Sequence, residues 1–415
     1  MTKYVLINCY SDNNKGDLGI IQSTIDYIKK HDENADVACV STYNASDPHF
    51  VSEHVLLKKD IKVFPSIFGE LNIGKNKSAI IKIIRFIFDT IRIGLACLLP
   101  IRFTSKVLFS KSEQQTLSIL RQADYIISKG GSFICNEKRI RDKIALIRFL
   151  YIFLLSLKLK KKVIILNQSI GPVYGRLSIS YVNYILSKCH KVVLRENMCI
   201  KRYPYLRFPS DTIVSNDIAF FLRPESSNFH FDLTKINIGF TIKYVEKTKE
   251  SAYRDMIKDS IEHIIEKYQN CHIYIYSQVP IDKDIEAGWA IYKMIKDEYK
   301  NNISFITQDY SSRTLKYLYS QMTLFIGTRL HSTIFAMGEA VPSICISYHG
   351  TKAEGIFSNM KSFNYVISKY NSAELIRQID DLYQNLDKQK NILRDCLKQQ
   401  EICFSNMFKE IFCDN

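Results

Sequence analysis

The chain has 415 residues, 46% of them hydrophobic and 24% charged, which is long enough for two domains with ordinary hydrophobic cores. This composition excludes an intrinsically disordered chain. The formal net charge of +15 favours partners of opposite sign, such as nucleic acid, an anionic membrane surface or phosphorylated small molecules. Nucleic acid is the least supported, because the sequence has no zinc-finger spacing, no basic zipper and no RNP-like aromatic segment.

Eleven cysteines are scattered along the chain without a C-x-x-C pair, which is typical of reduced thiols in a cytosolic protein. The first residues lead directly into an apolar strand pattern at 4–9, so we expect no signal peptide and a cytoplasmic location. No H-x-x-x-H or D-x-D pair stands at the end of an expected strand. We therefore expect neither a metal nor a cofactor.

Apolar strand patterns alternate with amphipathic helical patterns along the chain. The first series of strands is expected at residues 4–9, 36–40, 124–128, 162–167 and 191–194, and helices between them include 18–30 and 178–188. A segment at 223–228 then has the composition of a linker. The second series of strands is expected at residues 236–242, 271–277, 303–307, 323–326 and 343–347, and helices between them include 250–268 and 282–299.

This alternation predicts an α/β protein with two Rossmann-like domains that face a cleft, which is the GT-B-type arrangement. We expect the first domain at residues 1–225, with polar turns suited to sugar hydroxyls. The second domain is expected at residues 236–371, with a site for an anionic ligand. Residues 372–415 are polar with a helical pattern, and we expect them to form a helical tail.

Two apolar segments interrupt the pattern, at residues 79–103 and 144–159. The first carries four ionisable residues at helical spacing, which a membrane-spanning helix rarely tolerates: Lys82, Arg85, Asp89 and Arg92. A helix in contact with a membrane surface and a helix buried in the domain both fit these patterns. The sequence leaves the two alternatives open.

Residues 323–352 carry the strongest signal for a functional site. An apolar strand ends at Gly327 and Thr328, and a helical pattern begins with Arg329 and His331. We expect Thr328 to cap this helix, whose N-terminal N–H groups and two basic side chains would then hold a carboxylate or phosphate. Lys352, after the next strand, would reach the same anion. The plain alternative is that Arg329 pairs with a nearby carboxylate and His331 is an ordinary helix-start histidine.

Polar turns after expected strands of the first domain are a candidate binding site, because ligands of open parallel sheets bind beyond the carboxyl ends of strands. An aspartate at a helix start opposes anion binding, so we assign the turn containing Asp17 to sugar hydroxyls. A glycine turn lets backbone approach a ligand, although a purely structural turn is equally compatible. The expected acceptor-binding residues are Asn14, Gly16, Asp17, Gly130, Gly131, Ser132 and Gln168.

Motifs in these segments resemble those of the polysaccharide pyruvyl transferase family. The resemblance is carried by Arg329-Leu330-His331, Ile334-Phe335-Ala336, Val341-Pro342 and Tyr348 with Lys352, and earlier by Asn14 to Ile20, Gly130 to Phe133, Gly171-Pro172 and Val193 to Glu196. It covers nearly the whole chain, and the motifs occur in the family's order. Two positions differ, because Lys129 replaces a glycine and Lys243 stands where many members have an arginine, whose planar fork suits carboxylate and phosphate better.

The resemblance implies a two-domain enzyme that transfers the pyruvyl group of phosphoenolpyruvate onto two hydroxyls of one sugar, forming a pyruvate ketal and releasing phosphate. His331 is the expected general acid, Arg329 the residue that holds the donor anion, and Lys352 the residue that stabilises the leaving phosphate. The other expected donor contacts are Thr328, Leu330, Lys243, Arg195 and Arg176. The sequence leaves open which of the last three cations is the second anion contact.

The implied acceptor is a sugar of a cell-surface polysaccharide precursor, of the exopolysaccharide or capsule type, either free or carried on a lipid. A lipid-linked acceptor would place the protein peripherally on the inner face of the plasma membrane. The alternative enzyme is a GT-B-type glycosyltransferase that uses a nucleotide sugar. A third interpretation is a non-catalytic saccharide-binding or membrane-binding protein with this fold.

Overall fold

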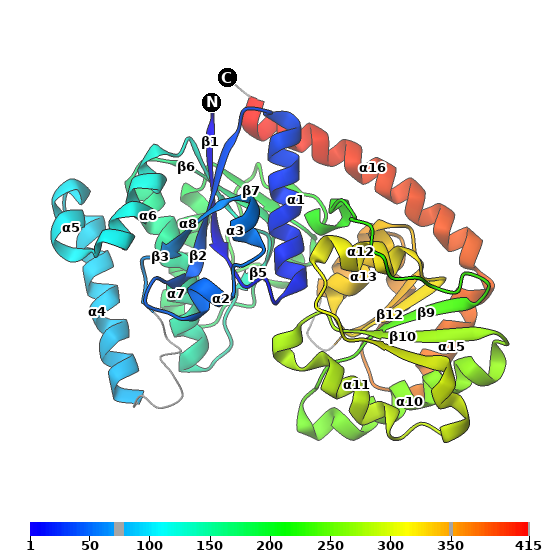
Figure 1. Cartoon of the computed structure of the whole chain (residues 1–415). Coiled ribbons are helices and arrows are strands. Elements are labelled where there is room, and N and C mark those ends of the chain that lie inside the picture. Colours follow the sequence, from blue (N-terminus) through cyan, green and yellow to red (C-terminus); the bar gives the residue numbers. More distant parts are fainter. Residues whose placement is uncertain (70–78, 348–351, 414–415) are drawn as a thin grey trace. The chain divides into compact units, whose positions relative to one another are not determined.

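The structure of the protein is a computed structural model that describes residues 1–69, 79–347 and 352–413. The chain forms two compact units (Figure 1). Unit 1 contains Met1–Asp12, Thr24–Ser215 and the residues from Phe408 onward, and unit 2 contains Asn13–Ser23 and Asn216–Met407. A short segment from the start of the chain therefore belongs to the second unit.

Unit 1 is built on an eight-stranded parallel sheet in the order β3-β2-β1-β4-β6-β7-β8, with β5 paired to β6. The inner strands are buried along almost their whole length, as expected for a parallel sheet with helices on both faces. The strands are β1 (Lys3–Cys9), β2 (Asp36–Asn44), β3 (Lys62–Ser66), β4 (Tyr125–Ser128), β5 (Gly131–Ile134), β6 (Lys162–Ile170), β7 (Lys191–Leu194) and β8 (Ile213–Val214). The helices are α1 (Lys15–His31), α2 (His49–Ser52), α3 (Leu57–Asp60), α4 (Ala79–Leu98), α5 (Ile101–Leu108), α6 (Lys111–Gln122), α7 (Ile140–Lys158), α8 (Arg176–Lys188) and α9 (Met198–Arg202).

Unit 2 is built on a six-stranded parallel sheet in the order β11-β10-β9-β12-β13-β14, with helices on both faces (Figure 1). Its strands are β9 (Ile236–Thr241), β10 (Cys271–Tyr276), β11 (Ile303–Ile306), β12 (Leu324–Gly327), β13 (Ser343–Ile346) and β14 (Val366–Ile367). Its helices are α10 (Glu250–Lys267), α11 (Asp284–Tyr292), α12 (Ser312–Ser320), α13 (Leu330–Gly338), α14 (Lys352–Asn359), α15 (Ser372–Gln384) and α16 (Leu386–Cys413), which ends in unit 1. Short 3₁₀ helices are η1 (Ile218–Phe221), η2 (Lys247–Lys249), η3 (Pro280–Asp282), η4 (Asp297–Asn302) and η5 (Phe363–Tyr365).

The predicted fold class, two α/β units with parallel sheets, is confirmed. The expected strands of both series are present, and the structure adds β3, β5, β8 and β14, which their short and mixed sequences did not reveal. The helix expected at residues 282–299 is divided into α11 and η4. It is interrupted because the backbone turns to an extended conformation at Lys296, just before Asp297.

Helix α4 is held to unit 1 by a buried polar cluster on one of its faces. Arg92 donates to Asp89 at 2.6 Å, to the two oxygens of Glu113 at 2.7 and 2.9 Å and to the carbonyl of Ile67 at 2.6 Å. Asp89 also accepts from the N–H of Gly69 at 2.8 Å. Among the described residues, no helix is both long and apolar enough to span a bilayer.

We predict that Arg92→Leu lowers the free energy of unfolding by about 3–5 kcal/mol, because Asp89 and Glu113 would stay buried without their cation. Urea unfolding followed by circular dichroism measures this loss. Arg102→Leu, at an exposed position of α5, is the matched control and is expected to change the unfolding free energy by less than about 0.5 kcal/mol. Equal midpoints for the two variants would contradict the prediction.

Candidate functional site

The carboxyl edge of the unit 2 sheet brings charged residues from three adjacent strands together. Lys243 follows β9, Asp282 and Asp284 follow β10, and Arg329 follows β12. Because β10, β9 and β12 are neighbours in a parallel sheet, the segments after them meet at one edge. This edge is the candidate functional site.

Arg329 is paired with two carboxylates. Its guanidinium donates to Asp284 Oδ1 at 2.5 Å and lies 2.9 Å from Asp282 Oδ2. Asp284 is fully buried and also accepts from the N–H groups of Gln278 and Val279, whereas Asp282 is 52% exposed. Burial raises the pKa of Asp284, and Arg329 opposes that rise. The plain alternative, that Arg329 pairs with a nearby carboxylate, describes this residue in the structure, and its role in holding an anionic donor stays a prediction.

Thr328 is not the cap of α13, contrary to the sequence-based expectation. Its hydroxyl is hydrogen-bonded to the phenol of Tyr253 at 2.7 Å, and its N–H donates to the carbonyl of Thr241. The N-cap residue is Arg329, which makes no side-chain cap bond because its side chain extends to the two aspartates. Ser332 instead donates to the carbonyl of Arg329 at 2.6 Å and closes the first turn.

Lys243 is a partly buried cation beside this pair. Burial, followed by the positive charge of Arg329, lowers the pKa of Lys243 to about 8, with Asp282 and Asp284 opposing the shift. Its backbone N–H donates to the hydroxyl of Tyr253 at 3.4 Å. The same tyrosine thus links the segment after β9 to Thr328 after β12. A lysine with this pKa changes its charge just above neutral pH.

His331, in the first turn of α13, lies against a buried carboxylate. Its Nε2 atom is 3.6 Å from Asp217 Oδ2, and the side chain is 20% exposed. The other oxygen of Asp217 caps η1 by accepting from the N–H of Ala219 at 3.0 Å. In the described part of the chain, His331 Nε2 is buried without a hydrogen-bond partner, so Asp217 is its nearest electrostatic partner.

The position of Asp217 is fixed by a buried lysine. Lys316 of α12 donates to the carbonyls of Phe220 and Leu222, at 2.6 and 2.8 Å, and pairs with Glu339 at 3.2 Å. It therefore holds η1, which Asp217 caps, against α12. The histidine and its carboxylate are supported by the interior of unit 2.

The predicted acceptor turn at the start of α1 lies in unit 2, against His331. A methyl group added at Gly16 would lie 2.4 Å from His331 Nδ1. Lys15 holds the turn in place through three contacts. Its N–H donates to the carbonyl of Gln278, its own carbonyl accepts from the hydroxyl of Ser312, and its ammonium pairs with Asp309 at 2.6 Å. Asn14 donates to Asp17 at 2.7 Å, so these two predicted acceptor residues bond to each other.

Two further predicted residues of this region are Leu330 and Lys352. Leu330 is the first residue of α13 and is partly buried. Lys352 is the first residue of α14, after β13. Tyr348, which the sequence motif pairs with Lys352, lies outside the described residues. The assigned roles of Leu330 and Lys352 stay predictions.

In unit 1, Gln168 supports the predicted glycine turn at Gly130 and Gly131. With its amide oriented to satisfy its neighbours, Gln168 accepts from the N–H groups of Ser132 and Phe133 and donates to the carbonyl of Lys129, at 3.1 to 3.2 Å. Gly131 has φ 123°, which a residue with a side chain rarely adopts. Gln168 thus holds the turn formed by Gly130, Gly131 and Ser132.

The two predicted cations of unit 1 differ in exposure. Arg195 is 1% exposed and donates to the hydroxyl of Ser169 at 2.8 Å. Arg176 is exposed at the start of α8. A second anion contact therefore stays a prediction for both residues, and Lys243 is the candidate that the structure places beside Arg329.

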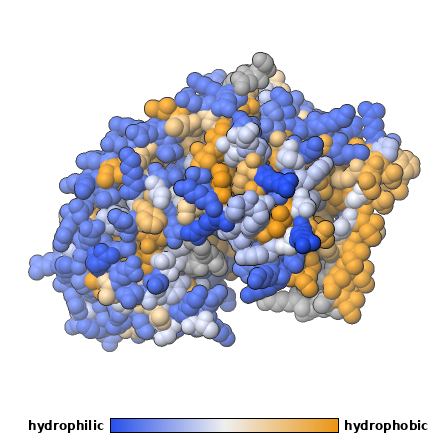
Figure 2. Space-filling model, turned by 180° about the vertical axis from the view of Figure 1, so that it is seen from behind, coloured by the Kyte–Doolittle hydropathy of each residue, from blue (hydrophilic) through white to orange (hydrophobic). Residues whose placement is uncertain are grey.

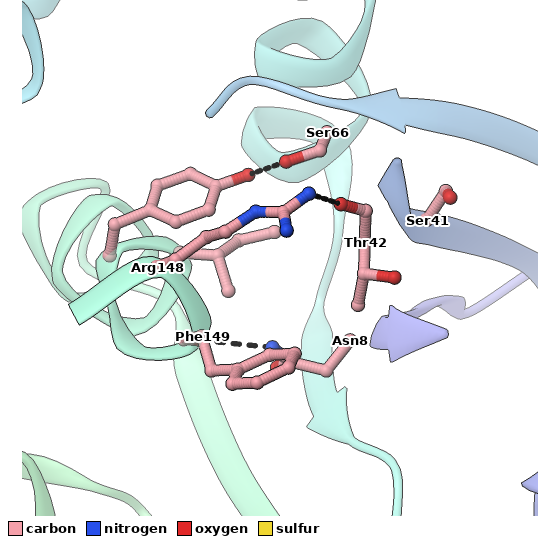
Figure 3. Close-up of a pocket in the computed structure, with 8 residues that line it drawn as sticks. Asn8, Ser41, Thr42, Ser66, Arg148 and Phe149 are labelled. Atoms are coloured by element: carbon pink, nitrogen blue, oxygen red, sulfur yellow. Dashed lines mark hydrogen bonds between the residues drawn. The ribbon is translucent and has the colours of Figure 1, made fainter. Parts of the chain in front are cut away.

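A polar pocket lies between α7 and the carboxyl-terminal parts of β1, β2 and β3 (Figure 3). Arg148 donates to the carbonyl of Thr42 at 2.9 Å, Asn8 donates to the carbonyl of Phe149 at 2.9 Å, and Tyr151 bonds to Ser66 at 2.8 Å. The space between these side chains is about 10 Å³, the size of one water molecule. The pocket fastens α7 to the sheet and has no room for a sugar ring.

Sequence reasoning missed the carboxylates of the site. Asp282-Lys283-Asp284 is a D-x-D pair, but it begins several residues beyond β10, and we considered only strand ends. Asp217 lies in the polar turn Ser215-Asn216-Asp217, which follows β8 directly. This turn was not among those predicted to bind a ligand. Their partners Arg329 and His331 are far away in the sequence, so spacing gave no indication of the pairs.

The two units have the GT-B fold, as comparison with solved structures shows. A putative UDP-N-acetylglucosamine 2-epimerase from Listeria monocytogenes has a TM-score of 0.59 at 12% identity, covering 100% of this chain and 97% of its own. HepE from Anabaena, solved with UDP-glucose, has a TM-score of 0.57 at 10% identity, with 99% of both chains covered. At these identities the likeness concerns the fold alone.

Within this fold class, the chain belongs to the polysaccharide pyruvyl transferase family, whose model matches residues 14–350. The resemblance found in the sequence motifs is thereby confirmed. The amylovoran biosynthesis protein AmsJ of Erwinia amylovora is 23% identical over 368 residues, which cover 83% of each chain.

We predict that Gly16→Ala reduces turnover about 100-fold, because the new methyl group would displace the imidazole of His331. The effect is measured as phosphate release from phosphoenolpyruvate, the donor that the sequence resemblance implies, in the presence of a saccharide acceptor. Gly94→Ala is the matched control, since a methyl group there meets nothing within 4 Å, and its turnover is expected to equal that of the wild type. Wild-type turnover in Gly16→Ala would contradict the placement of His331 in the site.

Proposed function

We propose that the protein transfers the pyruvyl group of phosphoenolpyruvate onto a sugar of a cell-surface polysaccharide precursor, forming a pyruvate ketal. Membership of the pyruvyl transferase family supports a transferase, and the similarity to a protein of amylovoran biosynthesis supports a role in polysaccharide synthesis. The observation that carries the proposal is the pairing of His331 with the buried Asp217 at the edge where Lys243 and Arg329 also lie.

The reaction needs one proton donor and a site for two anionic groups. Protonation of the methylene carbon of phosphoenolpyruvate makes the neighbouring carbon electrophilic, and a first sugar hydroxyl then attacks it. A second hydroxyl of the same sugar replaces phosphate as the C–O bond breaks, leaving a methyl group, a carboxylate and two ketal oxygens. One hydroxyl proton restores the general acid, and the other leaves with phosphate.

His331 is the proposed general acid. An imidazole exchanges protons readily near neutral pH. Asp217, 3.6 Å from Nε2, balances the positive charge that the ring carries before it gives up its proton. Gly16 supports the other side of the ring, so the imidazole is held from two directions. An imidazole held in position is a more effective general acid than an unconstrained one.

The donor's anionic groups are proposed to bind Lys243 and Arg329, with Lys352 at the leaving phosphate. Arg329 and Lys243 together carry two positive charges, and Asp282 and Asp284 carry two negative ones, so an anion cannot simply be added. Asp284 is buried and holds two backbone N–H groups, whereas Asp282 is half exposed and ends a short 3₁₀ helix. We therefore expect the anion to replace Asp282 on Arg329 while Asp284 keeps the guanidinium in place.

The acceptor is proposed to be a saccharide, free or lipid-linked, and no separate cofactor is needed in this scheme. Gly130, Gly131, Ser132 and Gln168 form the braced turn of unit 1 that is proposed to contact it. The loop of Asn14, Gly16 and Asp17, next to the general acid, is proposed to hold the reacting hydroxyls. A cytoplasmic location of the reaction is part of the same proposal.

We predict that His331→Ala lowers phosphate release in the presence of acceptor about 100-fold or more, because the general acid is removed. Asp217→Asn is expected to lower it by a smaller factor, since the ring stays but loses its charge partner. His230→Ala, at an exposed histidine, is the matched control and is expected to leave turnover unchanged. Wild-type turnover in His331→Ala would overturn the assigned role.

Calorimetry separates the proposal from nucleotide-sugar transfer. The wild-type protein is titrated with phosphoenolpyruvate and, separately, with UDP and UDP-glucose. Binding of phosphoenolpyruvate that weakens in Lys243→Met supports the proposal. Tight binding of UDP without any binding of phosphoenolpyruvate would favour a glycosyltransferase instead.

We predict that phosphoenolpyruvate binding weakens as pH rises above about 8, the pKa of Lys243, because the ammonium becomes neutral. The affinity should fall by up to about tenfold for each pH unit above that value, in a range where the donor phosphate is already fully ionised. Lys243→Arg keeps its charge and should bind without this pH dependence. Calorimetric titrations from pH 7 upward measure the profiles.

Asp282→Asn is the companion variant of opposite sign. It removes the exchangeable counterion of Arg329, so its affinity for phosphoenolpyruvate should exceed that of the wild type. Asp297→Asn, which removes one carboxylate from an exposed ion pair with Lys300 elsewhere in unit 2, serves as the control for the same general change in charge. Identical pH profiles for the wild type and Lys243→Arg would contradict the assignment of Lys243.

A further inference from the structure

Helices α4 and α5 expose an apolar face on unit 1. The outward residues of α4 follow helical spacing, and several are more than half exposed, including Ile80, Ile84, Ile87, Ile91 and Leu98. Phe88 on α4 and Phe103 and Val107 on α5 extend the face, with exposures of 62 to 69%. Figure 2 shows it as an orange band on the right-hand side, where α4 lies in this view. A contiguous apolar surface of this kind marks an interaction site.

The exposed charges of residues 79–122, which contain α4, α5 and α6, have a single sign. Residues 79–122 contain seven cations, Lys82, Arg85, Arg92, Arg102, Lys106, Lys111 and Arg121, and two acids, Asp89 and Glu113. Both acids are buried and bound to Arg92 on the opposite side of α4. No acidic side chain of this segment therefore reaches the surface, and the exposed charges beside the apolar residues are positive.

A basic pocket borders the apolar residues of α5. It has a volume of about 340 Å³ and is lined by Arg102, Lys106 and Arg121, together with polar side chains of Ser105, Gln114 and Ser118. Three cations and three hydrogen-bonding groups around one hollow suit a phosphodiester. Phe103 and Val107, which are exposed on the same helix, lie beside these cations in the sequence.

A second, apolar pocket lies along α4. It has a volume of about 330 Å³ and is lined by Ile93, Gly94 and Cys97 of α4, by Leu146, Ile147 and Leu154 of α7, and by Leu177 and Tyr181 of α8, among others. Unit 1 thus offers an apolar pocket and an apolar helix face on the same element, with a basic pocket next to them. Water is a poor partner for such a surface.

We infer that the face formed by α4 and α5 docks on the surface of an anionic phospholipid bilayer. The apolar side chains enter the boundary between headgroups and acyl chains, while Arg102, Lys106 and Arg121 bind lipid phosphates. Charge complementarity favours this occupant over a second copy of the chain, because two such faces would bring their cations together. The inference is independent of the proposed function, since it uses no residue of the unit 2 site.

Vesicle flotation with the full-length protein tests the inference. Vesicles of phosphatidylcholine alone are compared with vesicles that also contain phosphatidylglycerol. We expect binding to the anionic vesicles at low salt and weaker binding at high salt. Arg102→Gln with Lys106→Gln should weaken this binding about 30-fold, because each cation near an anionic surface contributes about 1 kcal/mol. Ile84→Gln with Ile91→Gln should weaken it about tenfold or more.

Matched controls remove the same groups from other surfaces. Lys29→Gln with Lys30→Gln removes two exposed cations of α1, and Leu233→Gln with Ile402→Gln removes two exposed apolar side chains. Both are expected to bind vesicles as the wild type does, and circular dichroism checks that all variants are folded. Failure of the wild type to bind anionic vesicles, or equal loss in the controls, would overturn the inference. So would a dimer in sedimentation equilibrium that Ile84→Gln with Ile91→Gln dissociates, since the face would then join two copies of the chain.

Discussion

The ion pair between Arg329 and Asp284 is the constraint on which the edge of unit 2 depends. Asp284 also accepts from the N–H groups of Gln278 and Val279, so the pair fixes the segment after β10. Gln278 in turn accepts from the N–H of Lys15, and the next residue, Gly16, lies against His331. This chain of contacts begins at Arg329, which precedes α13, and returns to His331, the second residue of that helix.

This closed chain of contacts explains how a cluster whose two cations and two carboxylates balance in charge still holds its guanidinium in a fixed position. A buried carboxylate with three donor residues holds the guanidinium in one place, while the half-exposed carboxylate of Asp282 pairs with the Nη1 group of the same guanidinium. Leaving an arginine wholly unpaired in a protein interior is costly, so resting counterions are expected at sites that receive anions. Asp284 orients the guanidinium of Arg329, and Asp282 occupies the place where a ligand anion would bind.

The fold could be predicted from sequence because a doubly covered parallel sheet leaves a strong periodic signal. The buried strands and the amphipathic helices were visible as alternating patterns, and the positions of Arg329 and His331 at the start of a helix followed from the same patterns. The partners of these two residues could not be predicted. Asp284 and Arg329 are separated by 45 positions in the sequence. Tyr253, 75 positions before Thr328, is hydrogen-bonded to the hydroxyl of Thr328, which therefore does not cap the helix. Local spacing carries no information about such contacts, because the sheet order decides which segments meet.

The segment Asn13–Ser23 belongs to unit 2, although nearly two hundred residues of unit 1 separate it from the rest of that unit. The second half of the chain is therefore not a self-sufficient module. A fragment starting at Asn216 would lose the glycine turn that covers the imidazole, and an exchange of halves between related proteins would pair each histidine with a foreign turn. Recombination that respects the linear order of the chain would therefore cut through the site.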